Sequence, residues 1–214
     1  GDPAALPVRN VRVEGNFEHL DQTELQGQLA GVLQGSFATL NISVLRQAAE
    51  SLPWVAEAGV RRLWPDGVLV RVVERVPVAR WGDDALLSDA AQRYQPASLD
   101  GFGQLPRLQG PAGSEAELWR SYQEFSWVFA PLPFAIAAVE QLERGGWRIQ
   151  FDNDLQLLIG RQGDPLQLPA LVRLLRGPLS PYLMRMAYID LRYNDGFAVG
   201  WRGKGTTSDS QDRF

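Results

Sequence analysis

Cysteine is absent from this chain of 214 residues, which excludes disulfides, thiolate nucleophiles and cysteine-based metal sites. His19 is the only histidine and Lys204 the only lysine, so arginine supplies almost all of the positive charge. The formal net charge of −4 gives no basic field of the kind that nucleic-acid binding requires, and we expect no nucleic-acid partner. A chain without cysteine is compatible with the cytosol and equally with the periplasm.

Long hydrophobic runs are also missing. The most apolar stretch, residues 125–139, falls short of the ~20 apolar residues that a membrane-spanning helix needs, and it contains Pro131 and Pro133. The sequence begins with GDPAALPV, without a methionine, and we interpret it as a fragment whose native N-terminus, with any membrane anchor, is missing. Hydrophobic residues nevertheless make up 45% of the chain, which is enough to build real cores.

The first third of the sequence predicts a small domain over residues 7–77. Valines that alternate with polar residues predict a strand at 8–13. Apolar residues at helical spacing follow Asp21 and again Asn41, and both residue types favour helix starts. Two valine-rich strands flank the turn at 65–67 and predict a hairpin. We therefore expect two helices on one face of a three-stranded sheet.

Residues 78–201 predict a second domain, a mostly antiparallel β-sheet with two helices, so that the whole chain is α+β. The predicted strands are a short pair at 86–87 and 93–94, a meander between 134 and 161, and a final hairpin within 187–201. Ser114 and Glu117 predict a capping box at the first helix, after a Gly/Pro-rich loop at 99–113. The polar tail, residues 202–214, is predicted to be disordered.

The sequence offers little for catalysis. His19 lies just before a helix without a G-x-S-x-G motif to support a triad, so an ordinary surface histidine is the favoured interpretation. Two pairs of aspartates, 83–84 and 152/154, lie in turns, where aspartate is common for local hydrogen bonding. The arginines at 61–62 and 71/75 fit a solvated sheet face. We predict no catalytic residue, no metal site, no cofactor and no enzyme activity.

The last hairpin, within AYIDLRYNDGFAVGW, is the strongest candidate for a binding site. Asn194-Asp195-Gly196 predicts a tight turn, and Phe197, Val199 and Trp201 then alternate with Ala198 and Gly200. One interpretation is that the aromatic residues complete the core of the domain. The other is that the last strand lies at the edge of the sheet, where small residues let another backbone approach and add a strand.

Several stretches resemble one known family. The first third of the chain resembles a POTRA domain in three stretches, VRNVRVEGN, LPWVAEAGVRRLWPDGVLVRVVERV and the following PVARW. The second domain is similar to the extracytoplasmic region of the FtsQ/DivIB family of cell division proteins in two stretches, NDLQLLIGR and the ending YIDLRYNDGFAVGW. The resemblance covers most of the chain, but the cytoplasmic tail and single membrane helix of that family are not in this sequence.

The resemblance implies a scaffold of the divisome on the periplasmic side of the inner membrane, at the division septum, anchored by a missing N-terminal helix. It implies binding to FtsB, and with it FtsL, as well as contacts with other divisome proteins. The implied partner-binding residues are Arg192, Tyr193, Gly196, Phe197, Ala198, Val199, Gly200 and Trp201. Phe197 stands at a variable position of the motif, and Arg192 and Asp190 either pair with charges on the partner or are solvated.

Two other classes remain open at this point. A POTRA-containing protein of outer-membrane assembly or secretion would bind nascent polypeptide strands, but such proteins usually carry several POTRA repeats and a transmembrane barrel, and the sequence has one POTRA-like unit and no barrel-like segments. A periplasmic hydrolase would require a pocket around His19 with a nearby nucleophile.

Overall fold

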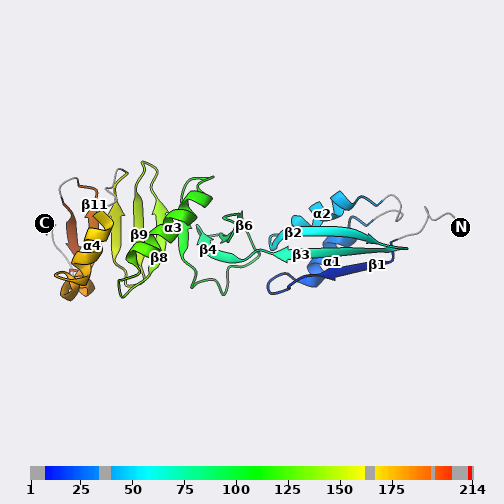
Figure 1. The fold of residues 1–214 in the computed structure, drawn as a ribbon, viewed down its shortest axis with the longest axis horizontal. Helices are drawn as coiled ribbons and strands as arrows, with labels where there is room; N and C mark the ends of the chain where they lie inside the picture. The colour runs from blue at the N-terminus through cyan, green and yellow to red at the C-terminus, as the bar shows by residue number, and fades with distance from the viewer. Residues whose placement is uncertain (1–7, 34–39, 162–166, 194–195, 204–211, 214) are drawn as a thin grey trace. The chain divides into compact units, whose positions relative to one another are not determined.

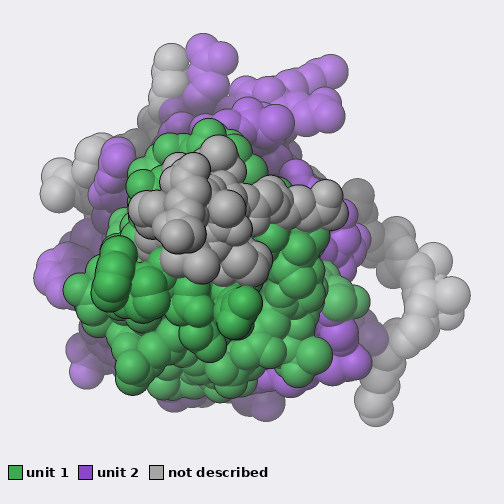
Figure 2. All heavy atoms as spheres, turned by 90° about the vertical axis from the view of Figure 1, so that its right-hand side faces the viewer, with its two compact units in different colours: residues 1–77, 94–97 green, residues 78–93, 98–214 purple. Residues whose placement is uncertain are grey.

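The structure, a computed structural model, describes residues 8–33, 40–161, 167–193, 196–203 and 212–213. The chain divides into two compact units, coloured separately in Figure 2. The first unit comprises Gly1–Pro77 with Tyr94–Ala97, and the second comprises Val78–Arg93 with Ser98–Phe214. Each unit has its own hydrophobic core.

The first unit has the predicted order of elements (Figure 1). They are β1 Asn10–Glu14, α1 Gln22–Ala30, α2 Ile42–Glu50, β2 Val55–Leu63 and β3 Gly67–Glu74. The sheet order is β1-β3-β2, with β1 parallel and β2 antiparallel to β3. Both helices pack against one face of this sheet, as predicted, and the buried core is formed mainly by Leu25, Leu29, Leu45, Ala49, Val55, Val68, Val70 and Val72.

The two helices of this unit begin at the predicted polar residues. The side chain of Asp21 accepts a hydrogen bond from the Thr23 N–H, and that of Asn41 accepts from the Ser43 N–H. These bonds satisfy backbone donors that have no partner within a helix, which fixes where each helix starts. The sequence signal was strong here because a cap is a local interaction.

A tertiary contact joins the end of β3 to the segment before α1. The sequence did not indicate this contact. The Glu74 carboxylate accepts hydrogen bonds from the successive backbone N–H groups of Glu18, His19 and Leu20, the last at 2.6 Å. The His19 ring stacks on Trp54 at 4.4 Å between centroids. An anionic acceptor on successive amides is a strong arrangement, and it holds this segment against the sheet.

A ten-stranded sheet, formed mainly by the second unit, runs within the described residues in the order β13-β12-β11-β10-β9-β8-β7-β4-β5-β6. The strands are β4 Pro77–Trp81, β5 Ala85–Ser88, β6 Arg93–Tyr94, β7 Arg107–Gln109, β8 Ile136–Gln141, β9 Trp147–Phe151, β10 Gln156–Ile159, β11 Met186–Leu191, β12 Ala198–Trp201 and β13 Asp212–Arg213. The helices are α3 Glu115–Phe129, α4 Gln167–Arg176 and the 3₁₀ helix η2 Ser180–Arg185. The α+β class is confirmed.

The sheet contains parallel pairs that the sequence did not indicate. The meander β8-β9-β10 is antiparallel as predicted, but β11 runs parallel to β10 because α4 and η2 intervene. β7 pairs parallel with β4 on one side and with β8 on the other. The prediction of a loop throughout residues 99–113 is therefore wrong at β7, whose three residues are too few to show a periodic pattern.

The predicted capping box at α3 is also wrong. Ser114 occupies the N-cap position, but its hydroxyl donates to the Pro111 carbonyl at 2.6 Å and makes no cap bond. Its φ and ψ of −89° and 6° lie outside the extended region that N-cap residues usually adopt. The helix itself forms as predicted, with Leu118 and Phe129 buried against the sheet.

α4 connects β10 to β11 and so determines where the last hairpin lies. Its buried residues, Leu171, Val172 and Leu175, lie at helical spacing on one face, and Pro169 lies in its first turn. The helix ends just before Gly177 and Pro178, after which η2 leads directly into β11. The 3₁₀ helix was not predicted.

Candidate partner-binding site

The last hairpin of the second unit consists of β11 and β12. These strands are antiparallel, with Ile189 opposite Val199 and Asp190 opposite Ala198. Ile189 and Val199 are buried in the core of the unit, so the hairpin is fixed to the rest of the sheet by apolar burial. The turn residues Asn194 and Asp195 lie outside the described residues, and the predicted turn type is therefore left as a prediction.

The outer edge of β12 is partly occupied by the chain itself. Ala198 and Val199 pair antiparallel with Arg213 and Asp212 of β13. The prediction that the whole edge of the last strand is unpaired is therefore wrong at these two positions. Among the described residues, Gly200 and Trp201 have no strand partner on that side. The remainder of the predicted disordered tail, 204–211 and 214, lies outside the described residues.

The small residue Gly200 has a different role from the one predicted. A Cβ placed at Gly200 would overlap the ring of Tyr188 on the neighbouring strand. The ring therefore lies across Gly200, and the absence of a side chain there makes room for a residue of this chain. The interpretation that Gly200 leaves space for a partner's backbone is wrong for this face of the strand.

The aromatic residues of the hairpin are divided between core and surface. Phe197 and Trp201 are half-buried and pack against the core, which supports the first of the two interpretations for these residues. The Trp201 ring also meets Tyr182 edge-on at 6.1 Å, and the Arg185 guanidinium lies 6.0 Å from its centre. Tyr193 is 41% exposed.

Asp190 is buried rather than solvated, since only 4% of its surface is exposed. Its carboxylate accepts hydrogen bonds from the Arg192 Nε at 2.8 Å, from Nη2 at 2.6 Å and from the Arg192 backbone N–H at 3.0 Å. Burial raises the pKa of Asp190, but these bonds and the guanidinium charge outweigh it and lower that pKa below its ordinary value. The two residues thus pair with each other.

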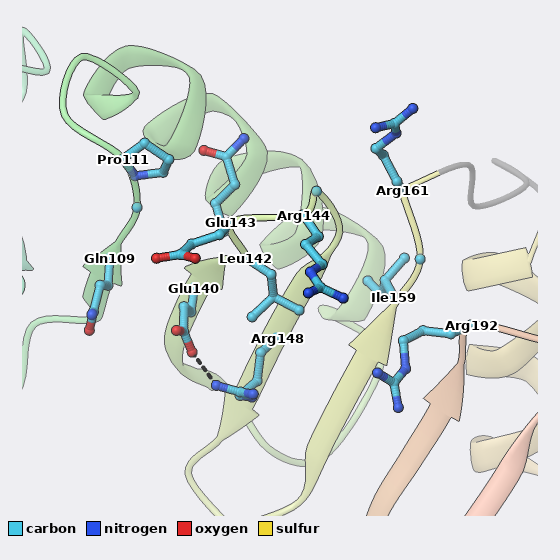
Figure 3. A pocket seen from close by; sticks show the side chains of 14 residues that line it. Gln109, Pro111, Glu140, Leu142, Glu143, Arg144, Arg148, Ile159, Arg161 and Arg192 are labelled. Atoms are coloured by element: carbon cyan, nitrogen blue, oxygen red, sulfur yellow. Dashed lines mark hydrogen bonds and ion pairs between the residues drawn. The ribbon is translucent and has the colours of Figure 1, made fainter.

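A cationic groove of about 760 Å³ lies beside this ion pair, at the ends of β8, β9, β10 and β11 (Figure 3). Its charged lining residues are Glu140, Glu143, Arg144, Arg148, Arg161 and Arg192. Four arginines and two glutamates give these residues a formal charge of +2, in a chain whose net charge is −4. Figure 3 shows Arg148 paired with Glu140, and Arg144 and Arg192 extending toward the same space.

Two glycines of the β8–β9 hairpin shape this groove. Gly145 and Gly146 have φ of 80° and 92°, a conformation that favours glycine. A Cβ at Gly145 would overlap the aliphatic part of the Arg161 side chain, which therefore packs directly on the hairpin backbone. The groove is consequently held by backbone geometry as well as by side chains. No local pattern in the sequence indicates that arginines from separate strands gather beside this hairpin.

The aspartates considered for catalysis make separate structural contacts. Asp83 and Asp84 form ion pairs with Arg107 and Arg93, and the Asp152 carboxylate accepts from the Ala135 N–H. In the part of the chain that the structure describes, no three His, Cys, Asp or Glu residues are grouped so that they would hold a metal ion. No described helix is both long enough and apolar enough to cross a bilayer.

The fold and this site define a POTRA domain followed by a β-sheet domain with a partly open terminal strand. Two family models match the chain: "POTRA domain, FtsQ-type" over residues 6–75 and "Cell division protein FtsQ/DivIB, C-terminal" over residues 79–192. The second match alone spans more than half of the sequence. The chain belongs to the FtsQ/DivIB family of cell division proteins.

Relatives named cell division protein FtsQ support this assignment over most of their length. The relative from Coxiella burnetii is 30% identical over 201 residues, covering 94% of this chain and 83% of the relative. The relative from Neisseria meningitidis is 34% identical over 200 residues, with 94% and 84% covered. That from Alcanivorax borkumensis is 34% identical over 204 residues, with 94% and 79% covered.

Proposed function

We propose that this chain is the periplasmic region of a non-enzymatic divisome scaffold that recruits FtsB, and with it FtsL, through its C-terminal strand during septum formation. The observation that carries the proposal is the antiparallel pairing of β13 on the outer edge of β12, because it makes this edge a place that accepts an added strand. The membership of a cell division family supplies the process in which such binding would act.

In the proposed complex, a segment of FtsB takes the place of β13 and extends along β12 to Trp201. Backbone hydrogen bonds to Ala198, Val199 and Gly200 supply the register, because main-chain pairing does not depend on side chains. Trp201 and the exposed Tyr193 supply apolar contact at either end of the added strand. Gly196 and Phe197 connect these two contacts.

The cationic groove adds an electrostatic component to the proposal. Arg192 lies at the end of β11, where it borders both the hairpin and the groove, and Arg144, Arg148 and Arg161 are the further cations there. A partner segment that leaves β12 in this direction would gain from acidic side chains, whose charge raises the association rate and fixes the orientation of the complex. We therefore expect the bound segment to carry carboxylates on the side of Arg192.

The native protein would be held on the periplasmic side of the inner membrane at the septum by an N-terminal helix that precedes these residues. The POTRA-like domain, residues 7–77, would contact other divisome proteins, and the β-domain, residues 78–201, would bind FtsB. No cofactor takes part.

The test is to mix this chain with the extracytoplasmic pieces of FtsB and FtsL, look for co-elution, and measure the affinity by calorimetry. Trp201→Ala should weaken binding by about tenfold or more, the loss typical of a central aromatic residue in an interface. Because Trp201 also packs on the core, Tyr193→Ala provides a second, exposed variant that should weaken binding without altering the fold.

Trp127→Ala is the matched control, since this tryptophan is 81% exposed but lies on α3. It should leave the affinity unchanged. Unaltered binding by Trp201→Ala and Tyr193→Ala together would place the interface elsewhere. Failure of the wild-type chain to co-elute with FtsB would overturn the proposed function.

A further inference from the structure

The tip of the β2–β3 hairpin in the first unit exposes a tryptophan. Trp64 is 86% exposed, the largest exposed fraction among the large hydrophobic residues that the structure describes. Leu63 beside it is half-buried, and Pro65 is exposed. Burying this indole against another surface would remove its apolar area from water, so the residue is suited to contact with such a surface.

The tip also carries positive charge. Arg9, Arg61 and Arg62 are exposed around it, and Asp66 is the acidic residue of the turn. Three arginines and one aspartate give a formal charge of +2, although the whole chain has −4. The Asp66 carboxylate accepts a hydrogen bond from the Asn10 side chain, and the Arg62 guanidinium donates to the Leu40 carbonyl, so these two charged side chains are held in place.

The first described residues of the chain start at this same tip. The Arg9 N–H donates to the Asp66 carbonyl at 2.9 Å, and Asn10 lies opposite Gly67 at the beginning of β1. From there β1 runs parallel to β3, away from the hairpin turn. The start of β1 and the hairpin turn that carries Trp64 are thus neighbours in space, although they are far apart in the sequence.

We propose that the β2–β3 tip, with Trp64, Pro65 and the surrounding arginines, docks on the surface of a bilayer that contains anionic phospholipid. An indole has an apolar body and a polar N–H, which suits the boundary between headgroups and acyl chains. Guanidinium groups bind lipid phosphates and are attracted to a negative surface. The exposed tryptophan and the cationic rim together match this surface rather than an apolar protein groove.

The inference rests on the membrane anchoring in the proposed function but is independent of the proposed partner. An anchor at the N-terminal end would keep the tip near the bilayer, so a weak contact would suffice, because tethering raises the effective concentration of the surface. The tip would then fix the orientation of the POTRA domain at the membrane.

The experiment tethers the whole chain by an N-terminal histidine tag to vesicles of phosphatidylcholine, phosphatidylglycerol and nickel-chelating lipid. Phospholipids brominated on their acyl chains quench tryptophan fluorescence on close contact. The wild-type chain should be quenched, and Trp64→Ala should lose most of that quenching. Trp127→Ala, which removes a similarly exposed indole from the second unit, should retain the quenching.

The charge is tested by Arg9→Gln with Arg61→Gln, which should reduce the quenching on vesicles with phosphatidylglycerol to the level seen without it. Equal quenching of wild type and Trp64→Ala, or no quenching of the wild type, would overturn the inference. Because Trp64 and both arginines are exposed, the variants should keep the wild-type melting temperature. Co-elution with FtsB is measured in the same preparations. A chain that binds FtsB but is not quenched would contradict this inference and leave the proposed function standing.

Discussion

Asp190 and Arg192 form a bidentate ion pair at the end of β11, with the carboxylate buried and 53% of the arginine side chain exposed. Asp190 is therefore buried in the domain, and Arg192 borders the cationic groove. The hydrogen bonds that Arg192 donates to the Asp190 carboxylate also raise the pKa of Arg192 above its ordinary value, so the cation is permanent. A residue expected to face a partner is thus also needed for the fold.

Asp190→Asn should destabilise the second unit by about 1 to 3 kcal/mol at neutral pH, because it removes the charge-assisted bonds with Arg192. The pKa of Asp190 is lower in the folded state than in the unfolded chain. Its contribution is therefore complete above the unfolded pKa of about 4 and is lost as the pH falls through the lower folded value. Urea unfolding of both proteins at several pH values measures this.

Asp154→Asn is a suitable control for that series, since it also neutralises an aspartate but lies in the β9–β10 turn. Its effect on stability should be smaller at neutral pH. A difference between wild type and Asp190→Asn that grows as the pH falls below about 4 would contradict the assignment of a lowered pKa.

Gly200→Ala should destabilise the hairpin by about 1 to 3 kcal/mol, because the new methyl group would overlap the Tyr188 ring and force it away. Removing the ring should relieve the strain. In a Tyr188→Ala background, the same change at Gly200 should have little effect, and a double-mutant cycle by thermal unfolding measures the difference. Additive effects of the two substitutions would show that the ring does not lie on Gly200.

Glu74→Ala should destabilise the first unit by about 1 to 3 kcal/mol, because the backbone N–H groups of Glu18, His19 and Leu20 lose their shared acceptor. Glu57→Ala provides the comparison, since Glu57 is an exposed glutamate on β2 of the same sheet. It should change stability by about 0.5 kcal/mol or less. Similar melting temperatures for the two variants would contradict the structural role of Glu74.

A chain that ends at Gly203 lacks β13 and should bind FtsB more tightly than the full chain. The two-residue pairing with Ala198 and Val199 is worth roughly 1 kcal/mol, so its removal should lower the Kd about fivefold. Calorimetry with both chains provides the measurement. Weaker binding by the shortened chain would mean that residues 204–214 contribute to the interface instead of competing for it.

The site was only partly predictable from the sequence. The final hairpin was located by its alternating residues and its family motif, because both are local signals. Which residues face the core, which face solvent and which edge is occupied depend on strands that are distant in the sequence. The roles of Gly200 and Asp190 accordingly differed from expectation, since each is set by a neighbouring side chain, Tyr188 or Arg192.

The sequence by itself determined the POTRA order of elements, the helix starts at Asp21 and Asn41, and the meander β8-β9-β10, because caps, turns and hydrophobic periods act over a few residues. Only the tertiary structure decided the parallel pairs at β7 and β11, the edge held by β13 and the gathering of arginines beside the β8–β9 hairpin. Those features join segments far apart in the chain. Their stability comes from non-local burial and pairing, which leave no repeating pattern in any one stretch.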